Sequence, residues 1–246
     1  MSTFRPPRPA TRRRLRTLCG AAVACALTST FLTAAVHGTK AHAADPAPAP
    51  VSRWQFDEGT GTTAADSAGA HPATLVGAAG WTGGIQGAAA LSPNGGYADT
   101  GAPAFDPTQS FTVTTWVRLN AISGYQTAVS IDGNQVSSFY LGLRDDTKRF
   151  AFVRLPGDAA AGAPAFPSAG FDPAANQWYH LAGVFDGTAH TLSLYVNGRL
   201  QASTPAPATW QPPGHLVVGR ARFGGNPVDF VRGAIDDVRA YPTALD

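Results

Sequence analysis

Apolar and polar residues alternate in short runs over most of the chain after residue 50. The range 111–119 is the clearest case, because its residues divide between the two faces of an extended strand. One face carries Phe111, Val113, Val117 and Leu119, and the other carries Thr112, Thr114, Trp116 and Arg118. No segment keeps a helical period beyond two turns, and Gly or Pro interrupts nearly every stretch. This pattern predicts an all-β sandwich or barrel.

Ten segments have the length and composition of strands, and turn signals separate them. They are 51–56, 111–119, 126–131, 139–143, 150–154, 178–185, 191–196, 199–203, 216–219 and 233–241. Asp186-Gly187 predicts a hairpin turn, and Asn197-Gly198 is a strong two-residue hairpin signal. About 190 residues is large for one simple sandwich but normal for a jelly roll. The length therefore favours a jelly roll, and the resemblance described below implies its two-sheet antiparallel β-sandwich form.

The first 43 residues have the pattern of a secretory signal peptide. An Arg/Pro-rich start is followed by 19 uncharged residues at 18–36 and by Ala41-His42-Ala43, a small-x-small cleavage site. A signal anchor is the alternative, since 19 residues can just span a bilayer. We expect cleavage after Ala43, a Pro/Ala linker at 44–50, a domain at 51–246, and a secreted protein without a membrane span. Export by the general or the twin-arginine route stays open.

Charge and cysteine usage exclude several classes of function. The chain has a formal charge of +2, but the basic residues crowd the leader, and from Ala44 onward the charge is −5. An acidic domain argues against nucleic acid as the partner. Both cysteines, Cys19 and Cys25, lie in the leader, so the domain has no disulfide and no thiolate metal site. Glu58 is the single glutamate, which excludes chemistry that needs a pair of glutamates.

Five blocks of the sequence, in order, carry a resemblance to a known family. They are Trp54-Gln55-Phe56-Asp57-Glu58-Gly59 with Ala64-Ala65-Asp66-Ser67, Ser110-Phe111-Thr112-Val113 with Trp116-Val117, the run 178–186, Leu194-Tyr195-Val196-Asn197-Gly198, and the run 233–239. Together they resemble the bacterial laminin-G-like jelly-roll family of the concanavalin A-like lectin/glucanase superfamily. The resemblance spans roughly 51–245 and implies the same fold. It leaves function open, because this fold hosts lectins, hydrolases, lyases and adhesion modules.

The enzyme classes of this superfamily find little support in the residues. Its glucanases carry two glutamates around an aspartate on one strand, and no predicted strand here holds a glutamate. The acid pairs Asp145-Asp146 and Asp236-Asp237 are neighbours in sequence, so their side chains point to opposite faces of a strand. A polysaccharide lyase could use His180, Tyr140 and Arg118 on one sheet face, and this alternative stays open.

A sugar-binding face needs flat aromatic rings and planar hydrogen-bond donors. Strand parity places several such side chains away from the core, and on a shared sheet they would form one binding face. The candidates are Trp116, Arg118, Tyr140, Arg144 and His180, with the loop residues Tyr125 and Trp210 at its rim. The alternative for Trp116 and Trp178 is a place in the core.

Calcium is a further implication of the resemblance, since many members bind one structural ion near the first and last strands. Asp66 and Asp237 occupy the matching places and would supply ligands. The residues after Asp66-Ser67 lack the polar side chains usual in the family. In the alternative, Asp66 caps its own turn and Asp236 pairs with a neighbouring arginine.

Together these observations predict a secreted, non-catalytic module that binds a carbohydrate or glycan surface. The partner would be a glycan or another extracellular polymer. A protein-interaction or adhesion module is the second hypothesis, and a lyase or hydrolase with an unusual site is the third.

Overall fold

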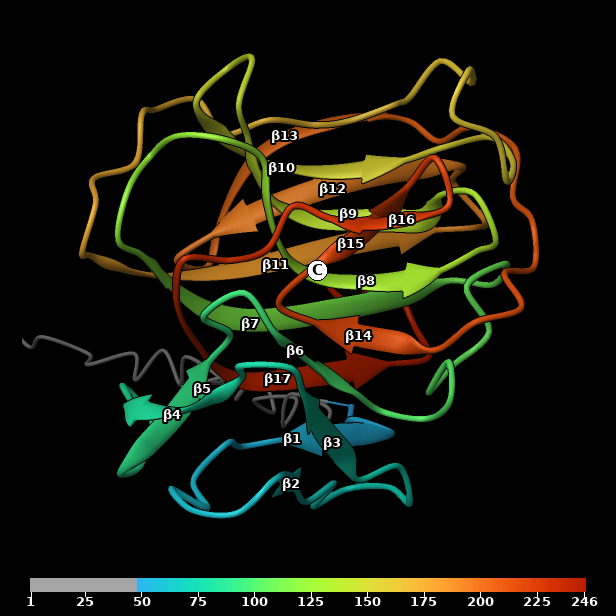
Figure 1. Ribbon diagram of the computed structural model, residues 1–246. Helices are drawn as coiled ribbons and strands as arrows, with labels where there is room; N and C mark the ends of the chain where they lie inside the picture. The colour runs from blue at the N-terminus through green and yellow to red at the C-terminus, as the bar shows by residue number, and fades with distance from the viewer. Residues whose placement is uncertain (1–47) are drawn as a thin grey trace, which may run out of the picture. The chain divides into compact units, whose positions relative to one another are not determined.

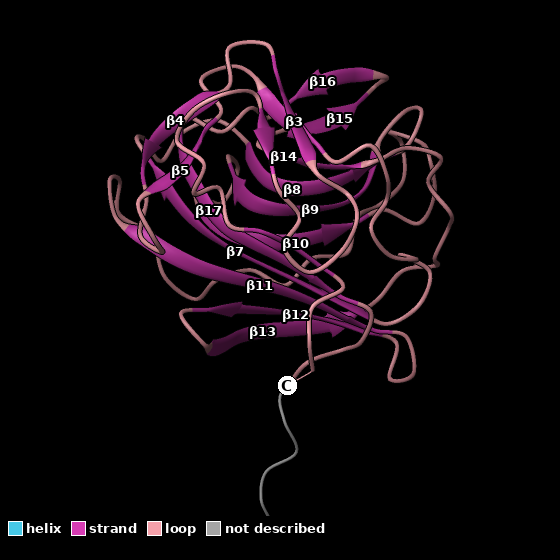
Figure 2. Ribbon diagram, turned by 90° about the horizontal axis from the view of Figure 1, so that it is seen from below, coloured by secondary structure: helices cyan, strands magenta, loops and turns pink. Residues whose placement is uncertain are grey.

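Strands joined by turns and loops make up residues 48–246, the part of the chain that the computed structural model describes. No residue in this range is helical, and so none belongs to a helix long and apolar enough to cross a membrane. Two large antiparallel sheets stack face to face, one above the other in Figure 2. This arrangement confirms the predicted all-β sandwich. The predicted signal peptide (1–43) lies outside the described residues, as does most of the linker.

Sheet A contains eight of the described strands and includes both ends of the domain. They are β1 (Ser52–Trp54), β4 (Gly80–Gly83), β5 (Ala89–Ser92), β7 (Phe111–Leu119), β11 (Trp178–Asp186), β12 (Thr191–Val196), β13 (Arg199–Pro205) and β17 (Gly233–Tyr241). The strand order is β13-β12-β11-β7-β17-β5-β4, and β1 pairs with β17 (Figure 1). Strands far apart in sequence therefore become neighbours, as a jelly roll requires.

Sheet B contains seven of the described strands. They are β2 (Thr63–Ala64), β3 (Ala73–Val76), β6 (Tyr97–Asp99), β8 (Gln126–Asp132), β9 (Ser137–Arg144), β10 (Arg149–Arg154) and β14 (Leu216–Val218), in the order β10-β9-β8-β14-β6-β3-β2. A separate hairpin of β15 (Ala221–Phe223) and β16 (Asn226–Val228) lies over β8 and β9, on the side away from sheet A (Figures 1 and 2).

Each of the ten predicted segments contains a strand, and the predicted face assignment of 111–119 is confirmed. The first strand is shorter than predicted, because the left-handed backbone of Phe56 (φ +58°) follows it. Asn197 and Gly198 both have positive φ (+51° and +72°), as a two-residue hairpin turn of type I′ requires. The strands β2–β6 and the β15–β16 hairpin were not predicted, because they are short and rich in Gly, Ala or polar residues.

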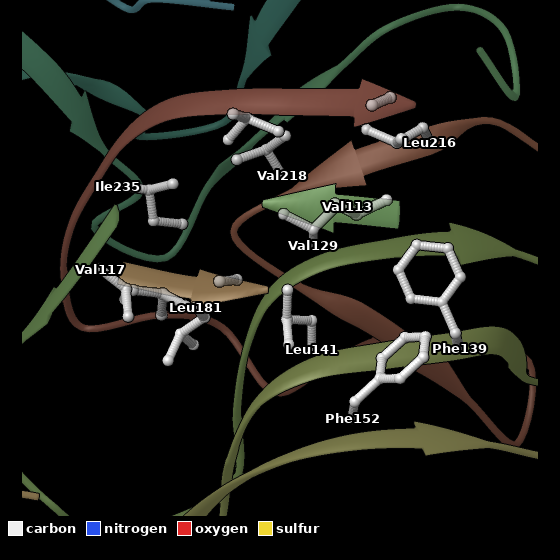
Figure 3. Packing of buried hydrophobic residues seen from close by; sticks show 14 of the residues in the cluster. Val113, Val117, Val129, Phe139, Leu141, Phe152, Leu181, Leu216, Val218 and Ile235 are labelled. Carbon is white, nitrogen blue, oxygen red and sulfur yellow. The ribbon is translucent and has the colours of Figure 1, made fainter. Parts of the chain in front are cut away.

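The core lies between the two sheets and is dominated by phenylalanine. Phe111 of β7 is fully buried, and its ring centroid lies 5.3 Å from that of Phe139, 6.0 Å from Phe152 and 5.8 Å from Phe185. These rings come from β9, β10 and β11, so Phe111 joins the two layers. Figure 3 shows Val117 and Leu181 of sheet A opposite Leu141, Phe139 and Phe152 of sheet B.

A fully buried arginine is part of this core. The guanidinium of Arg154 lies 4.3 Å from the ring centroid of Phe185 and 5.6 Å from that of Phe111, and its Nη2 donates to the Pro107 carbonyl (2.9 Å). Burial lowers the pKa of Arg154 to about 10, so the side chain stays charged at neutral pH. The positive charge of Arg154 is stabilised by the faces of two aromatic rings and by a backbone carbonyl, and not by a carboxylate.

Gly183 of β11 in sheet A lies directly against the Phe152 ring of sheet B, which yields a prediction. A Cβ at this position would lie 2.5 Å from the Phe152 ring, so Gly183→Ala overpacks the core. We expect the free energy of unfolding to fall by about 1–3 kcal/mol, seen as a lower Tm in thermal denaturation. Gly80→Ala is the control, because a Cβ there meets nothing within 4 Å. An equal Tm for both variants would contradict the close packing at Gly183.

Candidate functional site

The five predicted ligand-binding residues do not share one face. Trp116 and Arg118 of β7 and His180 of β11 lie on the outer face of sheet A, partly exposed. Tyr140 and Arg144 belong to β9 and lie on the outer face of sheet B. The core separates the two groups, so the predicted single binding face is wrong. The same separation rules out the lyase constellation of His180, Tyr140 and Arg118.

The outer face of sheet B carries a cavity of about 440 Å³, which we call the sheet B cavity. Its floor comes from β8, β9 and β10, and the loop after β10 and the β15–β16 hairpin supply further lining residues. The lining is mostly apolar with a few polar groups, as is typical of ligand sites. Its aromatic and charged lining residues are Tyr125, Tyr140, Arg144, Phe223 and Asp229.

Two exposed aromatic rings border the sheet B cavity. Tyr125 is 44% exposed and Phe223 is 47% exposed, and both are among the most exposed large hydrophobic residues of the described chain. Tyr125 also borders a second depression of about 620 Å³ that shares Asp229 with the cavity. The exposed ring of Tyr125 therefore stands where the two hollows meet.

Tyr140 positions the hairpin that lines the cavity. Its hydroxyl donates to the carbonyl of Arg222 in β15 (2.9 Å) and accepts from the backbone N–H of Ser137 (3.1 Å). Burial raises the pKa of Tyr140 above its usual range, so the hydroxyl keeps its proton at neutral pH. Both hydrogen bonds are made within the protein, and Tyr140 offers a ligand mainly its ring.

Arg144 is held in a fixed orientation at the same cavity. Its guanidinium lies 3.9 Å from the ring centroid of Phe166 and 5.8 Å from that of Tyr125. Its Nε donates to the Asp146 carboxylate (3.0 Å), and Nη2 forms a second bond to the same group. Arginine has five N–H donors, so several stay available to a ligand.

Asp229 is the acidic group of the sheet B cavity. Burial raises the pKa of its carboxyl to about 6. Within residues 48–246 its side chain makes no hydrogen bond or ion pair, although its backbone carbonyl accepts from Thr127 N–H (2.8 Å). An ionised carboxylate that is partly buried without donors is costly, and a ligand hydroxyl would relieve that cost.

Sequence analysis missed Asp229 and Phe223, and only Tyr125 of the two proposed loop residues lines the cavity. Nothing in the local sequence marks Asp229, whose place depends on how the hairpin folds back over sheet B. Trp210 instead donates from Nε1 to the Leu155 carbonyl (3.1 Å), and its ring lies over Gly133. Trp210 therefore holds loops together.

The carboxylates proposed as calcium ligands already accept hydrogen bonds from N–H groups of the protein. Asp66 accepts backbone N–H groups from Arg53 (2.8 Å), Gly69 (2.9 Å), Ala68 (3.2 Å) and His71 (3.2 Å). Burial works to raise the pKa of Asp66, but these hydrogen bonds outweigh it and lower the pKa. Asp66 therefore organises its own turn.

Asp237 is likewise satisfied by arginine. Its Oδ1 accepts from Arg53 Nε (2.7 Å), and its Oδ2 accepts from Arg239 Nη2 (2.6 Å). Burial opposes ionisation of Asp237, but Arg239 and Arg53 outweigh it and lower its pKa. Across residues 48–246 no group of three or more His, Cys, Asp or Glu side chains is placed to hold a metal. As they stand, Asp66 and Asp237 do not fit a calcium site.

The fold and the family now define the class of protein. The model of the Laminin_G_3 family, described as the concanavalin A-like lectin/glucanases superfamily, matches residues 92–246, more than half of the chain. The chain belongs to this family. No curated protein matches the sequence.

Two solved structures show how the fold is used elsewhere. One is domain 4 of AbnA, a GH43 extracellular arabinanase from Geobacillus stearothermophilus, solved in complex with arabinotriose. Its sequence is 20% identical to this chain, and the TM-score is 0.58. The match covers 80% of this chain and 94% of that domain. The other is the binding domain of botulinum neurotoxin DC, solved in complex with rat synaptotagmin II. Its sequence is 13% identical, the TM-score is 0.53, and the match covers 80% of this chain and 49% of that one. At such low identity these matches show a shared fold alone.

Asp229 gives a prediction about pH. Because its pKa is raised to about 6 in the folded state, the folded protein binds more protons than the unfolded chain between about pH 4 and 6. Ionised Asp229 therefore lowers stability above pH 6, and the loss disappears as the pH falls. We expect Asp229→Asn to be more stable than the wild type at neutral pH, by about 1 kcal/mol after allowance for partial exposure.

Thermal denaturation of both proteins from pH 4 to 7.5 measures this difference. The gain in Tm should be largest at pH 7.5, roughly 2–4 °C, and should shrink towards pH 4. The left-handed backbone of Asp229 (φ +58°) suits asparagine and adds an offset that does not depend on pH. A difference in Tm that is the same at every pH would contradict the raised pKa.

The occupied carboxylates give a prediction about calcium. Thermal denaturation in calcium chloride and in EDTA should give the same Tm within about 1 °C, because the carboxylates of Asp66 and Asp237 are already hydrogen-bonded to N–H donors. A clear rise in Tm with calcium that EDTA reverses would show that the N–H donors give way to the ion.

Proposed function

We propose that this protein is a secreted, non-catalytic module that binds a carbohydrate through the sheet B cavity. One observation carries the proposal: two exposed aromatic rings, Tyr125 and Phe223, border a cavity that also presents Arg144 and Asp229. A sugar ring offers an apolar C–H face to an aromatic side chain and hydroxyl groups to polar ones. The cavity therefore matches both parts of such a ligand.

The polar groups support a ligand rich in hydroxyls. Asp229 lacks a donor among the described residues, and a sugar hydroxyl can donate to it. Arg144 supplies N–H donors from a guanidinium that Asp146 and Phe166 already hold in place. Such preorganisation reduces the entropy lost when a ligand binds.

The arrangement of acids supports a non-catalytic role. Asp229 is the single carboxylate among the residues that line the sheet B cavity, so the pair used in glycoside hydrolysis is absent from this lining. The carboxylate of Glu58 accepts the backbone N–H of Ala65 (2.8 Å) and stabilises its own turn. The signal-peptide pattern of residues 1–43 supports secretion, where an extracellular glycan would be met.

Substitution of Tyr125 tests the proposal. The full chain would be applied to a glycan array and to pull-downs with insoluble cellulose, xylan and chitin. We expect binding to at least one glycan, weakened about tenfold in Tyr125→Ala, which corresponds to about 1.4 kcal/mol of lost stacking.

Trp178→Ala is the matched control, because it removes a partly exposed aromatic ring from the opposite outer face. Its binding to a neutral glycan should equal that of the wild type. Failure to bind any glycan, or binding that Tyr125→Ala leaves unchanged, would overturn the proposal and favour the protein-interaction alternative.

A further inference from the structure

The outer face of sheet A has a hollow of its own, a shallow depression of about 600 Å³, which we call the sheet A depression. It lies on the other side of the core from the sheet B cavity and shares no lining residue with it. The side chains around it are polar and aromatic in nearly equal number. They include Trp116, Trp178, His180, Asn197, Asp237 and Arg239.

Two cross-strand pairs on β7 and β11 build the aromatic part. Trp116 lies opposite His180, with ring centroids 5.2 Å apart and an interplanar angle of 60°. Arg118 lies opposite Trp178, and its guanidinium is 5.0 Å from the centroid of the Trp178 ring. All four side chains are partly exposed. Strand pairing therefore places both indole rings on the same outer face, at diagonal positions of two neighbouring strands.

Arginines outnumber carboxylates at the depression and beside it, because Arg239 lines it while Arg118 and Arg53 flank it. The one carboxylate in its lining, Asp237, is 4% exposed and is neutralised by Arg53 and Arg239. Within residues 48–246 Arg118 makes no ion pair. Burial lowers the pKa of His180, an effect that Arg239 increases and Asp237 opposes, so its imidazole is neutral at pH 7. The charge left for a ligand is that of arginine.

An amide donor completes the set. The side-chain oxygen of Asn197 accepts the backbone N–H of His180 (2.9 Å), which turns the amide NH2 group away from that bond. Asn197 is exposed, so this NH2 group can donate to a ligand. Indole rings, guanidinium groups and an amide donor are together suited to a flat, polar and negatively charged ring.

We propose that the sheet A depression is a second binding site, specific for carboxylate-bearing sugars such as the uronate residues of an acidic polysaccharide. Trp116 and Trp178 contact the sugar ring, and the guanidinium groups of Arg118 and Arg239 attract its carboxylate. The inference goes beyond the proposed function, because it concerns the opposite face and another class of glycan. Two sites on opposite faces would let one molecule bridge two polymer chains.

Calorimetric titration of the full chain with a short oligogalacturonate tests the site. The key comparison uses the same oligomer with its carboxyl groups methyl-esterified, which removes the charge and keeps the sugar. We expect measurable binding of the acid form, weaker at high salt, and binding of the ester at least about tenfold weaker.

Four variants locate the site on the molecule. Trp178→Ala should weaken binding about tenfold, and Arg118→Gln, which keeps the length of the side chain, should weaken it several-fold. Trp178→Phe should recover most of the binding, since it restores a flat ring. Tyr125→Ala should bind the oligogalacturonate within about twofold of the wild type, while it loses the neutral glycan. Equal Tm values would show that the variants are folded.

Three results would overturn the proposal. They are the absence of oligogalacturonate binding, equal affinity for the acid and the ester, and binding that Trp178→Ala leaves intact. Loss of the acidic ligand in Tyr125→Ala alone would assign it to the sheet B cavity. Because neutral and acidic glycans are measured separately, failure of this inference is distinguishable from failure of the proposed function.

Discussion

Phe111 holds the two layers of the sandwich together, and the chemistry of both outer faces depends on that packing. Once Phe111 and Val113 point into the core, alternation along β7 forces Trp116 and Arg118 outwards. The same rule acts on β9, where the burial of Phe139 and Leu141 turns Tyr140 to the other surface. The packing of one core thus determines which side chains lie on the outer face of sheet A and which lie on the outer face of sheet B.

The sheet B cavity depends in addition on a buried polar network. Asp132 accepts hydrogen bonds from Arg220 (2.9 Å) and Arg222 (3.2 Å), and the hydroxyl of Tyr140 donates to the Arg222 carbonyl. These contacts attach the β15–β16 hairpin to sheet B and so place Phe223 and Asp229 at the cavity. A buried ion pair adds little net stability, but it is well suited to specifying one position for a hairpin.

Local pattern was sufficient to predict the longer strands and the faces of their side chains, and insufficient to predict the short strands or which sheet each strand joins. Parity correctly separated Trp116 from Val117 and Tyr140 from Leu141, because alternation is a local property of the backbone. Whether Trp116 and Tyr140 meet depends on strand order, which long-range packing decides. The same limit hid Asp229, which reaches the cavity only through the fold of a hairpin that carries no strong strand signal.

The resemblance to a known family was reliable for the fold and less so for the site. It implied calcium at Asp66 and Asp237, yet these carboxylates are satisfied by backbone N–H groups and by arginine. Arg239 lies two residues after Asp237 on β17, and Arg53 lies on β1, the strand that pairs with β17. A shared aspartate indicates a metal site only when its neighbours leave its oxygens free.

Each of the two candidate sites presents one charged side chain that the described residues leave without an oppositely charged partner. Asp132, Asp237 and Asp66 are each satisfied inside the protein, and Arg154 is enclosed by aromatic rings. Within the described residues Asp229 has no donor, and Arg118 has no carboxylate partner. Asp229 is in a cavity that suits sugar hydroxyls, and Arg118 is on a surface that suits an anion, so we expect the two faces to select different glycans.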